Sequence, residues 1–216
     1  MHADWVTISA LATAGGTLVL AVATFASVRS ANRAARVAEQ TLLDGLRPQL
    51  MASRYNDPPE KVNFVDQHWV RVDGGRGVID VGDNVIYLAI ALRNVGRGMA
   101  VLHGWAAWPS ATSAINPDHH PIGDFRRLIR DLYVPFEGTG FWQGAIRDPA
   151  DPLFGQVRDC VKNREPLAVE LLYGDSNGGQ RAITRIALVP HEDQEGNLMW
   201  LASVGRHWNL DRAAPR

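Results

Sequence analysis

The hydrophobic and polar positions along the chain change their pattern once, at Pro48. Before this residue the sequence is uncharged from Val6 to Val28 and then becomes rich in alanine and arginine. After it, apolar and polar residues alternate in short runs, as they do in half-buried β-strands. The pattern predicts three parts: a transmembrane helix over residues 1–28, a helical stalk over 29–47 and a β-rich soluble domain over 48–216.

Nine runs in the soluble domain have the alternation and the composition of strands. Glycine, proline, asparagine or aspartate bound most of them, and little helical pattern lies between them. Short strands without intervening helices favour an antiparallel, sandwich-like domain over a parallel sheet. The runs are QLMASRY, KVNFV, HWVRV, NVIYLAIALRNVG, AVLHGWAAW, GFWQGAI, LAVELLY, RAITRIALVP and LMWLASVGRHW.

One or two short helices are expected among these strands. Asp151 suits an N-cap and Pro152 suits the first turn of a helix. One face of this helix would carry Leu153, Val157, Cys160 and Val161. Cys160 is the sole cysteine of the chain, and its place on this face indicates a core residue rather than a reactive thiol.

A second helix is predicted after Asp124, where apolar residues recur at i, i+3, i+4 and i+7. An alternative is a single helical turn before the strand-like sequence LYVPF. The apolar positions are Phe125, Leu128, Ile129 and Leu132.

The uncharged segment from Val6 to Val28 has the length of a membrane span. Its 23 residues would form a helix of about 34 Å, and a bilayer has a hydrocarbon core of ~30 Å. A secretory signal would need a positive N-terminus and a shorter apolar stretch, so we expect the segment to be retained. Positive residues concentrate on the cytoplasmic side of a span, and here they follow it: Arg29, Arg33 and Arg36. The sequence therefore predicts a bacterial inner-membrane protein with its N-terminus outside and its soluble domain in the cytoplasm.

The composition argues against nucleic-acid binding and against sites that need several cysteines. The formal net charge is −1, whereas a nucleic-acid-binding domain would normally be basic. A single cysteine excludes an intrachain disulfide and a cysteine-based zinc site built from this chain alone. No motif indicates a cofactor.

The stalk has small or apolar residues at alternating spacings of four and three. This heptad-like rhythm leaves open a homodimer through the membrane helix and stalk, although alanine-rich helices also produce such spacings by chance. The positions are Ala31, Ala35, Ala38, Leu42 and Gly45.

Several segments, taken in order, resemble a group of single-pass bacterial membrane proteins with an N-terminal anchor, an arginine-rich stalk and a β-rich soluble domain. The resemblance covers nearly the whole chain and implies a retained anchor, but no particular activity. The segments are GLRPQL, LRNVGRGMAVLHGW, DLYVPFEGTGFWQGA, LLYGDSNGGQR and RHWNLD.

The sequence GDSNG matches the G-x-S-x-G pattern of the serine-hydrolase nucleophile elbow. Asp193 and His207 follow Ser176 in the chain order of an α/β-hydrolase triad. An elbow requires a helix after the turn, however, and RAITRIAL alternates like a strand. The pattern therefore favours a β-hairpin loop, with catalysis by Ser176 as the alternative.

Two further clusters are candidate sites. Asp118, His119 and His120 lie together in NPDHHP, and a metal would need a further ligand from elsewhere in the fold. No His-x-x-x-His spacing supports a metal, so a solvated loop is the favoured interpretation. Near the C-terminus, Arg206, His207 and Trp208 combine charge with an aromatic surface, as binding hot spots do, with core or edge packing as the alternative.

These observations favour binding over catalysis. The hypothesis is a membrane-anchored binding or adaptor module that presents its β domain at the cytoplasmic face, with the lipid bilayer and a protein as its partners. A membrane-bound serine hydrolase is one alternative. An extracytoplasmic envelope or carbohydrate-binding module is the other.

Overall fold

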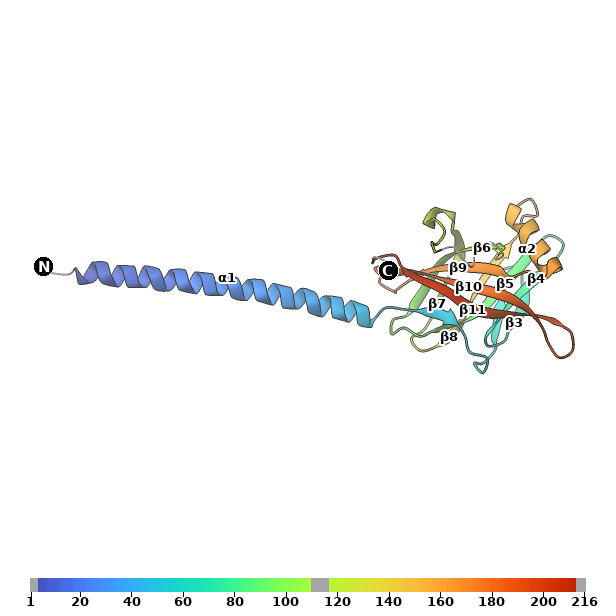
Figure 1. Cartoon of the computed structure of the whole chain (residues 1–216), viewed down its shortest axis with the longest axis horizontal. Helices are drawn as coiled ribbons and strands as arrows, with labels where there is room; N and C mark the ends of the chain where they lie inside the picture. The colour runs from blue at the N-terminus through green and yellow to red at the C-terminus, as the bar shows by residue number, and fades with distance from the viewer. Residues whose placement is uncertain (1–3, 110–116, 213–216) are drawn as a thin grey trace. The chain divides into compact units, whose positions relative to one another are not determined.

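The computed structural model describes residues 4–109 and 117–212, and it forms two compact units, Met1–Gly45 and Leu46–Arg216. The first unit is a single helix, α1 (Trp5–Gly45), that covers both the predicted span and the predicted stalk (Figure 1). Its segment Ile8–Leu43 is long and apolar enough to cross a membrane, and none of its most apolar window is buried. Several hydroxyl groups of α1 donate to carbonyls one turn back, for example that of Thr13 to the Ser9 carbonyl at 2.8 Å. These bonds lower the cost of placing a hydroxyl in apolar surroundings.

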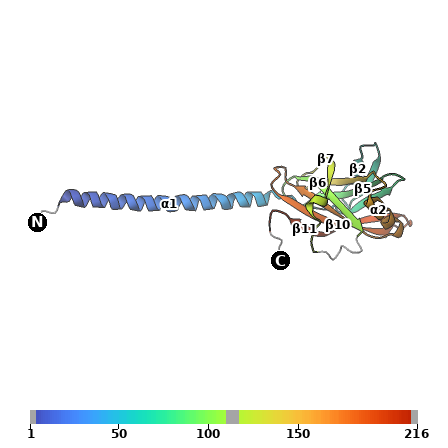
Figure 2. The same cartoon turned by 90° about the horizontal axis from the view of Figure 1, so that it is seen from above.

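The second unit is a curled antiparallel sheet of nine strands (Figures 1 and 2). Its hydrogen-bonded order is β1-β5-β4-β11-β10-β9-β6-β7, and β8 also pairs with β5. A separate hairpin is formed by β2 (Glu60–Asn63) and β3 (Trp69–Val72). The strands of the large sheet are β1 (Leu50–Ala52), β4 (Arg76–Val81), β5 (Ile86–Asn94), β6 (Ala100–Pro109), β7 (Arg126–Val134), β8 (Thr139–Ile146), β9 (Leu167–Gly174), β10 (Arg181–Glu192) and β11 (Leu198–Asn209).

The curl encloses the main core. Trp105 and Trp142 lie edge to face inside it, with ring centroids 5.3 Å apart. Helix α2 (Pro152–Asn163) contributes to the same core through Leu153, Phe154, Val157 and Cys160. The predicted mainly β, antiparallel fold is therefore confirmed. The sandwich-like packing comes from one continuous sheet that curls around its own core.

Helix α2 confirms the prediction made from its capping residues. The Asp151 side chain accepts a hydrogen bond from the Leu153 amide at 3.0 Å, and Pro152 occupies the first turn. The helix ends at Arg164, whose φ of 56° is left-handed. Cys160 is buried, and this burial raises the pKa of its thiol. The thiol is thus a core group, as expected from the sequence.

The helix predicted over Phe125–Leu132 is wrong. Only a short 3₁₀ turn, Ile122–Asp124, precedes the strand β7. In the ladder with β6, Leu132 pairs with Leu102 and Arg127 with Gly104, so four residues of β7 lie opposite a single residue of β6. This large bulge interrupts the in-out alternation of the strand. The resulting apolar spacing imitates that of a helix.

All nine strand-like runs contain a strand, and β4 was not expected. The residues Asp73, Gly74 and Gly75 before it form a turn, with Gly75 at φ 71°. β4 then pairs with β5 along its length and with β11 at Trp200 and Leu201.

Candidate functional site

The structure does not bring the three hydrolase candidates together. Ser176 lies in the hairpin turn between β9 and β10, and Asp193 lies in the turn after β10. The 12 residues of β10 separate these turns, a distance of about 40 Å at ~3.3 Å per residue. A strand follows Ser176 where an elbow needs a helix, so the favoured hairpin interpretation is confirmed.

His207 lies inside the curl, in a network of side chains from three strands. Its Nδ1 lies 3.0 Å from the Thr184 hydroxyl and 3.3 Å from the Tyr173 hydroxyl, and its Nε2 lies 3.2 Å from Asn209 Oδ1. Burial lowers the pKa of His207 and raises the pKa of Tyr173 to about 12. The Tyr173 hydroxyl also accepts a hydrogen bond from the Leu50 amide at 3.0 Å. His207 therefore acts as a neutral link between β9, β10 and β11.

This network predicts a loss of stability at mildly acidic pH. Burial disfavours the imidazolium, so the unfolded chain binds the proton of His207 more readily than the folded chain does. The contribution of neutral His207 is complete above its unfolded pKa of 6.5 and decreases as the pH falls below that value. Urea unfolding in micelles at pH 7.5 and pH 5.8 measures this change. We expect the wild type to lose more stability than His207→Gln over this interval, and equal losses would contradict the role of His207.

The segment NPDHHP, which we call the histidine segment, meets Trp208 on the outer face of the sheet, whereas His207 of the other candidate cluster lies inside the curl. The Trp208 indole donates to the carbonyl of Pro117 at 3.2 Å, and the Arg185 guanidinium donates to the carbonyl of Asp118 at 2.7 Å. The His120 ring lies 4.0 Å from Trp108. The described part of the histidine segment therefore covers the strands that carry the tryptophans. Asn116, its first residue, lies outside the described residues.

A buried ion pair lies beneath this segment. Glu170 Oε1 accepts from Arg185 Nε at 3.0 Å and from Nη2 at 2.7 Å, and both side chains are almost fully buried. The Arg185 guanidinium lies between two indole rings, 5.2 Å from Trp108 and 4.9 Å from Trp208. We call these four residues the Trp-Arg cluster. Its charges are paired and its rings are packed, which favours the packing interpretation of Trp208 over a binding platform.

The histidine segment forms no cluster of metal ligands within the described residues, because no group of three His, Cys, Asp or Glu side chains gathers there. His119 packs edge-on against Trp208, and the His120 amide donates to Glu170 Oε2 at 3.0 Å. Asp118 contributes its carbonyl to Arg185. Asp118, His119 and His120 thus attach the histidine segment to the Trp-Arg cluster.

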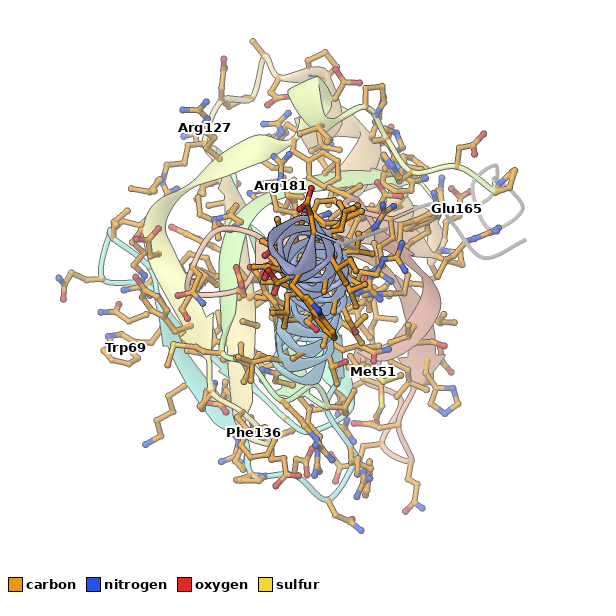
Figure 3. All side chains as sticks on the ribbon, turned by 90° about the vertical axis from the view of Figure 1, so that its left-hand side faces the viewer. Met51, Trp69, Arg127, Phe136, Glu165 and Arg181 are labelled. Atoms are coloured by element: carbon orange, nitrogen blue, oxygen red, sulfur yellow. The ribbon has the colours of Figure 1, made fainter. Side chains whose placement is uncertain are left out.

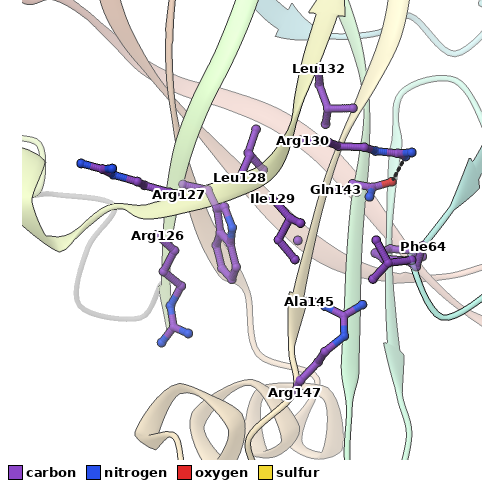
Figure 4. A pocket seen from close by; sticks show the side chains of 13 residues that line it. Phe64, Arg126, Arg127, Leu128, Ile129, Arg130, Leu132, Gln143, Ala145 and Arg147 are labelled. Carbon is purple, nitrogen blue, oxygen red and sulfur yellow. Dashed lines mark hydrogen bonds between the residues drawn. The ribbon is translucent and has the colours of Figure 1, made fainter.

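A groove lies where the curled sheet ends, between β7 and β8 (Figure 4). The two strands are consecutive in the chain and their turn spans Pro135–Gly138, yet no ladder pairs them in the described structure. The opening has a volume of about 240 Å³. Its residues are Phe64, Val65, Trp105, Arg126, Arg127, Leu128, Ile129, Arg130, Leu132, Gln143, Gly144, Ala145 and Arg147.

Four arginines line this groove, and their contacts differ. Arg126 makes a bidentate ion pair with Asp151, at 2.6 and 2.9 Å, and lies over the Trp105 ring. Arg130 donates to Gln143 Oε1 at 2.9 Å and so bridges β7 and β8 (Figure 4). Arg147 has one long contact, 3.4 Å, with Asp66.

The groove carries a surplus of positive charge. Arg126 and Arg147 contact carboxylates, whereas Arg127 and Arg130 contact none among the described residues. The Arg127 side chain points away from the groove and outward from the domain (Figures 3 and 4). The Arg130 charge is therefore left without a carboxylate partner, among the described residues, at the rim of an opening with an apolar floor.

No motif in the sequence predicts this groove. Its signal is the sequence RRLIRD, in which three arginines lie among apolar residues, but the apolar spacing of this stretch predicts a helix. β8 and Phe64 also line the groove, and the sequence RRLIRD contains no information about them. Only the curl of the sheet brings these parts together.

No family model matches the chain, and no curated protein is similar to it. One solved structure, described as the crystal structure of a protein from Archaeoglobus fulgidus, is similar over 65% of this chain and 96% of its own. The two share 11% sequence identity, with a TM-score of 0.25. A likeness this weak carries no argument about fold or function.

Proposed function

We propose that this protein is a single-pass inner-membrane protein whose cytoplasmic β domain binds a ligand in the groove between β7 and β8. The observation that carries the proposal is the groove itself, which combines an apolar floor with surplus positive charge. Concave sites of this kind, with an apolar lining and a few polar groups, are typical of ligand binding. Anchoring the domain would hold the bound molecule at the membrane, where the effective concentration of further partners is raised.

The anchor and its orientation are supported by α1. The segment Ile8–Leu43 has the length and hydropathy of a span, and its side chains are exposed, as those of a lipid-facing helix would be. Arg29, Arg33 and Arg36 follow the uncharged segment and favour a cytoplasmic C-terminal side.

Topology can be tested with a C-terminal tag and protease added to intact spheroplasts. We expect the tag to be protected until the cells are lysed, because the β domain lies inside. Cleavage in intact spheroplasts would contradict the cytoplasmic location and support the extracytoplasmic alternative. A periplasmic protein of the same cells, cleaved in the same sample, controls for protease access.

Occupancy of the groove can be tested in cells with a photo-crosslinking phenylalanine analogue at Ile129. This side chain is 77% exposed and lines the groove. The matched control is Val189, another exposed apolar residue, which lies on β10 and not in the groove. We expect adducts from Ile129 only. Equal or absent labelling at both positions would overturn the groove as the binding site.

A further inference from the structure

We infer that the groove between β7 and β8 binds a small soluble amphiphilic anion, a carboxylate or phosphate attached to a short apolar chain. This inference rests on the proposed function and specifies its ligand. Three features carry it: the chemistry of the floor, the unused hydrogen-bonding capacity at the rim, and the size of the opening.

The floor of the groove reaches the main core. Trp105 is 3% exposed and Leu132 is 8% exposed, yet both line the opening. Gly144 leaves room for the two indole rings beneath the floor, because a Cβ there would lie 2.7 Å from Trp142 and 3.0 Å from Trp105. A ligand's apolar chain would therefore be removed from water against aromatic and aliphatic side chains.

The rim offers guanidinium donors that the protein does not fully use. Arg130 Nη2 donates to neutral oxygens, those of Asn63 and Gln143, so its charge has no carboxylate partner among the described residues. The Asp66 carboxylate accepts a short hydrogen bond from Tyr87, at 2.6 Å, and contacts Arg147 at 3.4 Å only. Arg147 is directed back along β8 into the groove (Figure 4). Arg130 and Arg147 are therefore the groups that would hold an anion by charge-assisted hydrogen bonds.

The size of the opening indicates a small molecule. The opening has a volume of about 240 Å³. This accommodates an anionic group with a chain of a few carbons. It is below the ~300 Å³ at which pockets for drug-sized ligands begin.

The experiment uses hexanoate as the probe and the full chain in phosphatidylcholine nanodiscs, with empty nanodiscs as the blank. Binding is measured by ligand-observed NMR titration. We expect hexanoate to bind at least about tenfold more tightly than acetate, which lacks the chain, and than hexanol, which lacks the charge. Acetate binding equal to that of hexanoate would overturn the inference, because only surface charge would then be involved.

Variants locate the site. Arg147→Gln and Arg130→Gln should each lower hexanoate affinity by about tenfold, the size expected for one charge-assisted hydrogen bond. Arg97→Gln is the matched control, because Arg97 is exposed in the β5–β6 turn and does not line the groove. Thermal unfolding without hexanoate confirms that each variant is folded. Unchanged affinity in both groove variants would overturn the inference.

A last comparison separates a soluble anion from a lipid. In nanodiscs that contain phosphatidylglycerol, hexanoate should bind as it does in phosphatidylcholine. Loss of binding there would overturn the soluble ligand in favour of an anionic lipid headgroup. Crosslinking from Ile129 and the topology test do not depend on hexanoate, so failure of this inference is distinguishable from failure of the proposed function.

Discussion

Replacing both Leu18 and Leu20 with arginine is expected to release the protein from the membrane. Both side chains are exposed on α1, near the middle of the uncharged segment. Each arginine at the centre of a span costs about 2.5–3.5 kcal/mol, so the pair costs about 6 kcal/mol. The nine strongly apolar residues of the segment favour insertion by roughly 3–5 kcal/mol in total. The cost exceeds this gain, and alkaline carbonate should extract the variant while the wild type stays in the pellet.

The matched control places two arginines on the same helix beyond the predicted span. Val37 and Leu42 are as exposed as the two leucines but lie after Arg36. Val37→Arg combined with Leu42→Arg should leave the protein in the carbonate pellet, because these positions lie outside the span predicted from the uncharged segment. If the wild type itself is extracted by carbonate, or if Leu18→Arg with Leu20→Arg stays in the pellet, the predicted span is wrong.

Glu170→Gln is expected to destabilise the β domain by about 3–5 kcal/mol. Glu170 is fully buried, and Arg185 Nε and Nη2 both donate to its Oε1. Glutamine keeps the shape of the side chain but removes the negative charge, so the Arg185 guanidinium remains buried without its counterion. Urea unfolding of the full chain in micelles, followed by tryptophan fluorescence, measures this loss, because the micelle preserves α1.

Two further variants separate the charge effect from packing. Replacing both Glu170 and Arg185 with methionine removes the pair without leaving a lone charge, so we expect it to recover most of the stability. Glu192→Gln breaks the ion pair with Arg164, in which both side chains are more than half exposed, and should cost less than about 1 kcal/mol. A cost for Glu170→Gln as small as that for Glu192→Gln would show that the Trp-Arg cluster does not depend on its charges.

Local signals in the sequence predicted most elements correctly. α2 was identified from Asp151 and Pro152, because N-capping depends on a few neighbouring residues. The hairpin around Ser176 was identified from the alternation after it, because in-out alternation is a property of a single strand. The uncharged segment before Arg29 forms a continuous helix, as predicted. This element also depends on neighbouring residues only, because a helix satisfies its own backbone hydrogen bonds.

The errors and omissions arise where strands pair. β7 resembled a helix because a bulge opposite His103 breaks its alternation, and the bulge depends on the register with β6. The histidine segment and Trp208 were separate candidates in the sequence, about 90 residues apart, and only the ladder from β6 through β9 and β10 to β11 brings them together.

The sequence by itself determined the apolar helix, the mainly β class and the capped helix α2, because each depends on residues close together in the chain. Only the tertiary structure decided which side chains surround Arg185 and which surround the groove. The residues that meet there come from distant strands, Glu170 with Arg185 and Arg130 with Gln143. Their meeting depends on strand order and on the curl of the sheet, which no local pattern records.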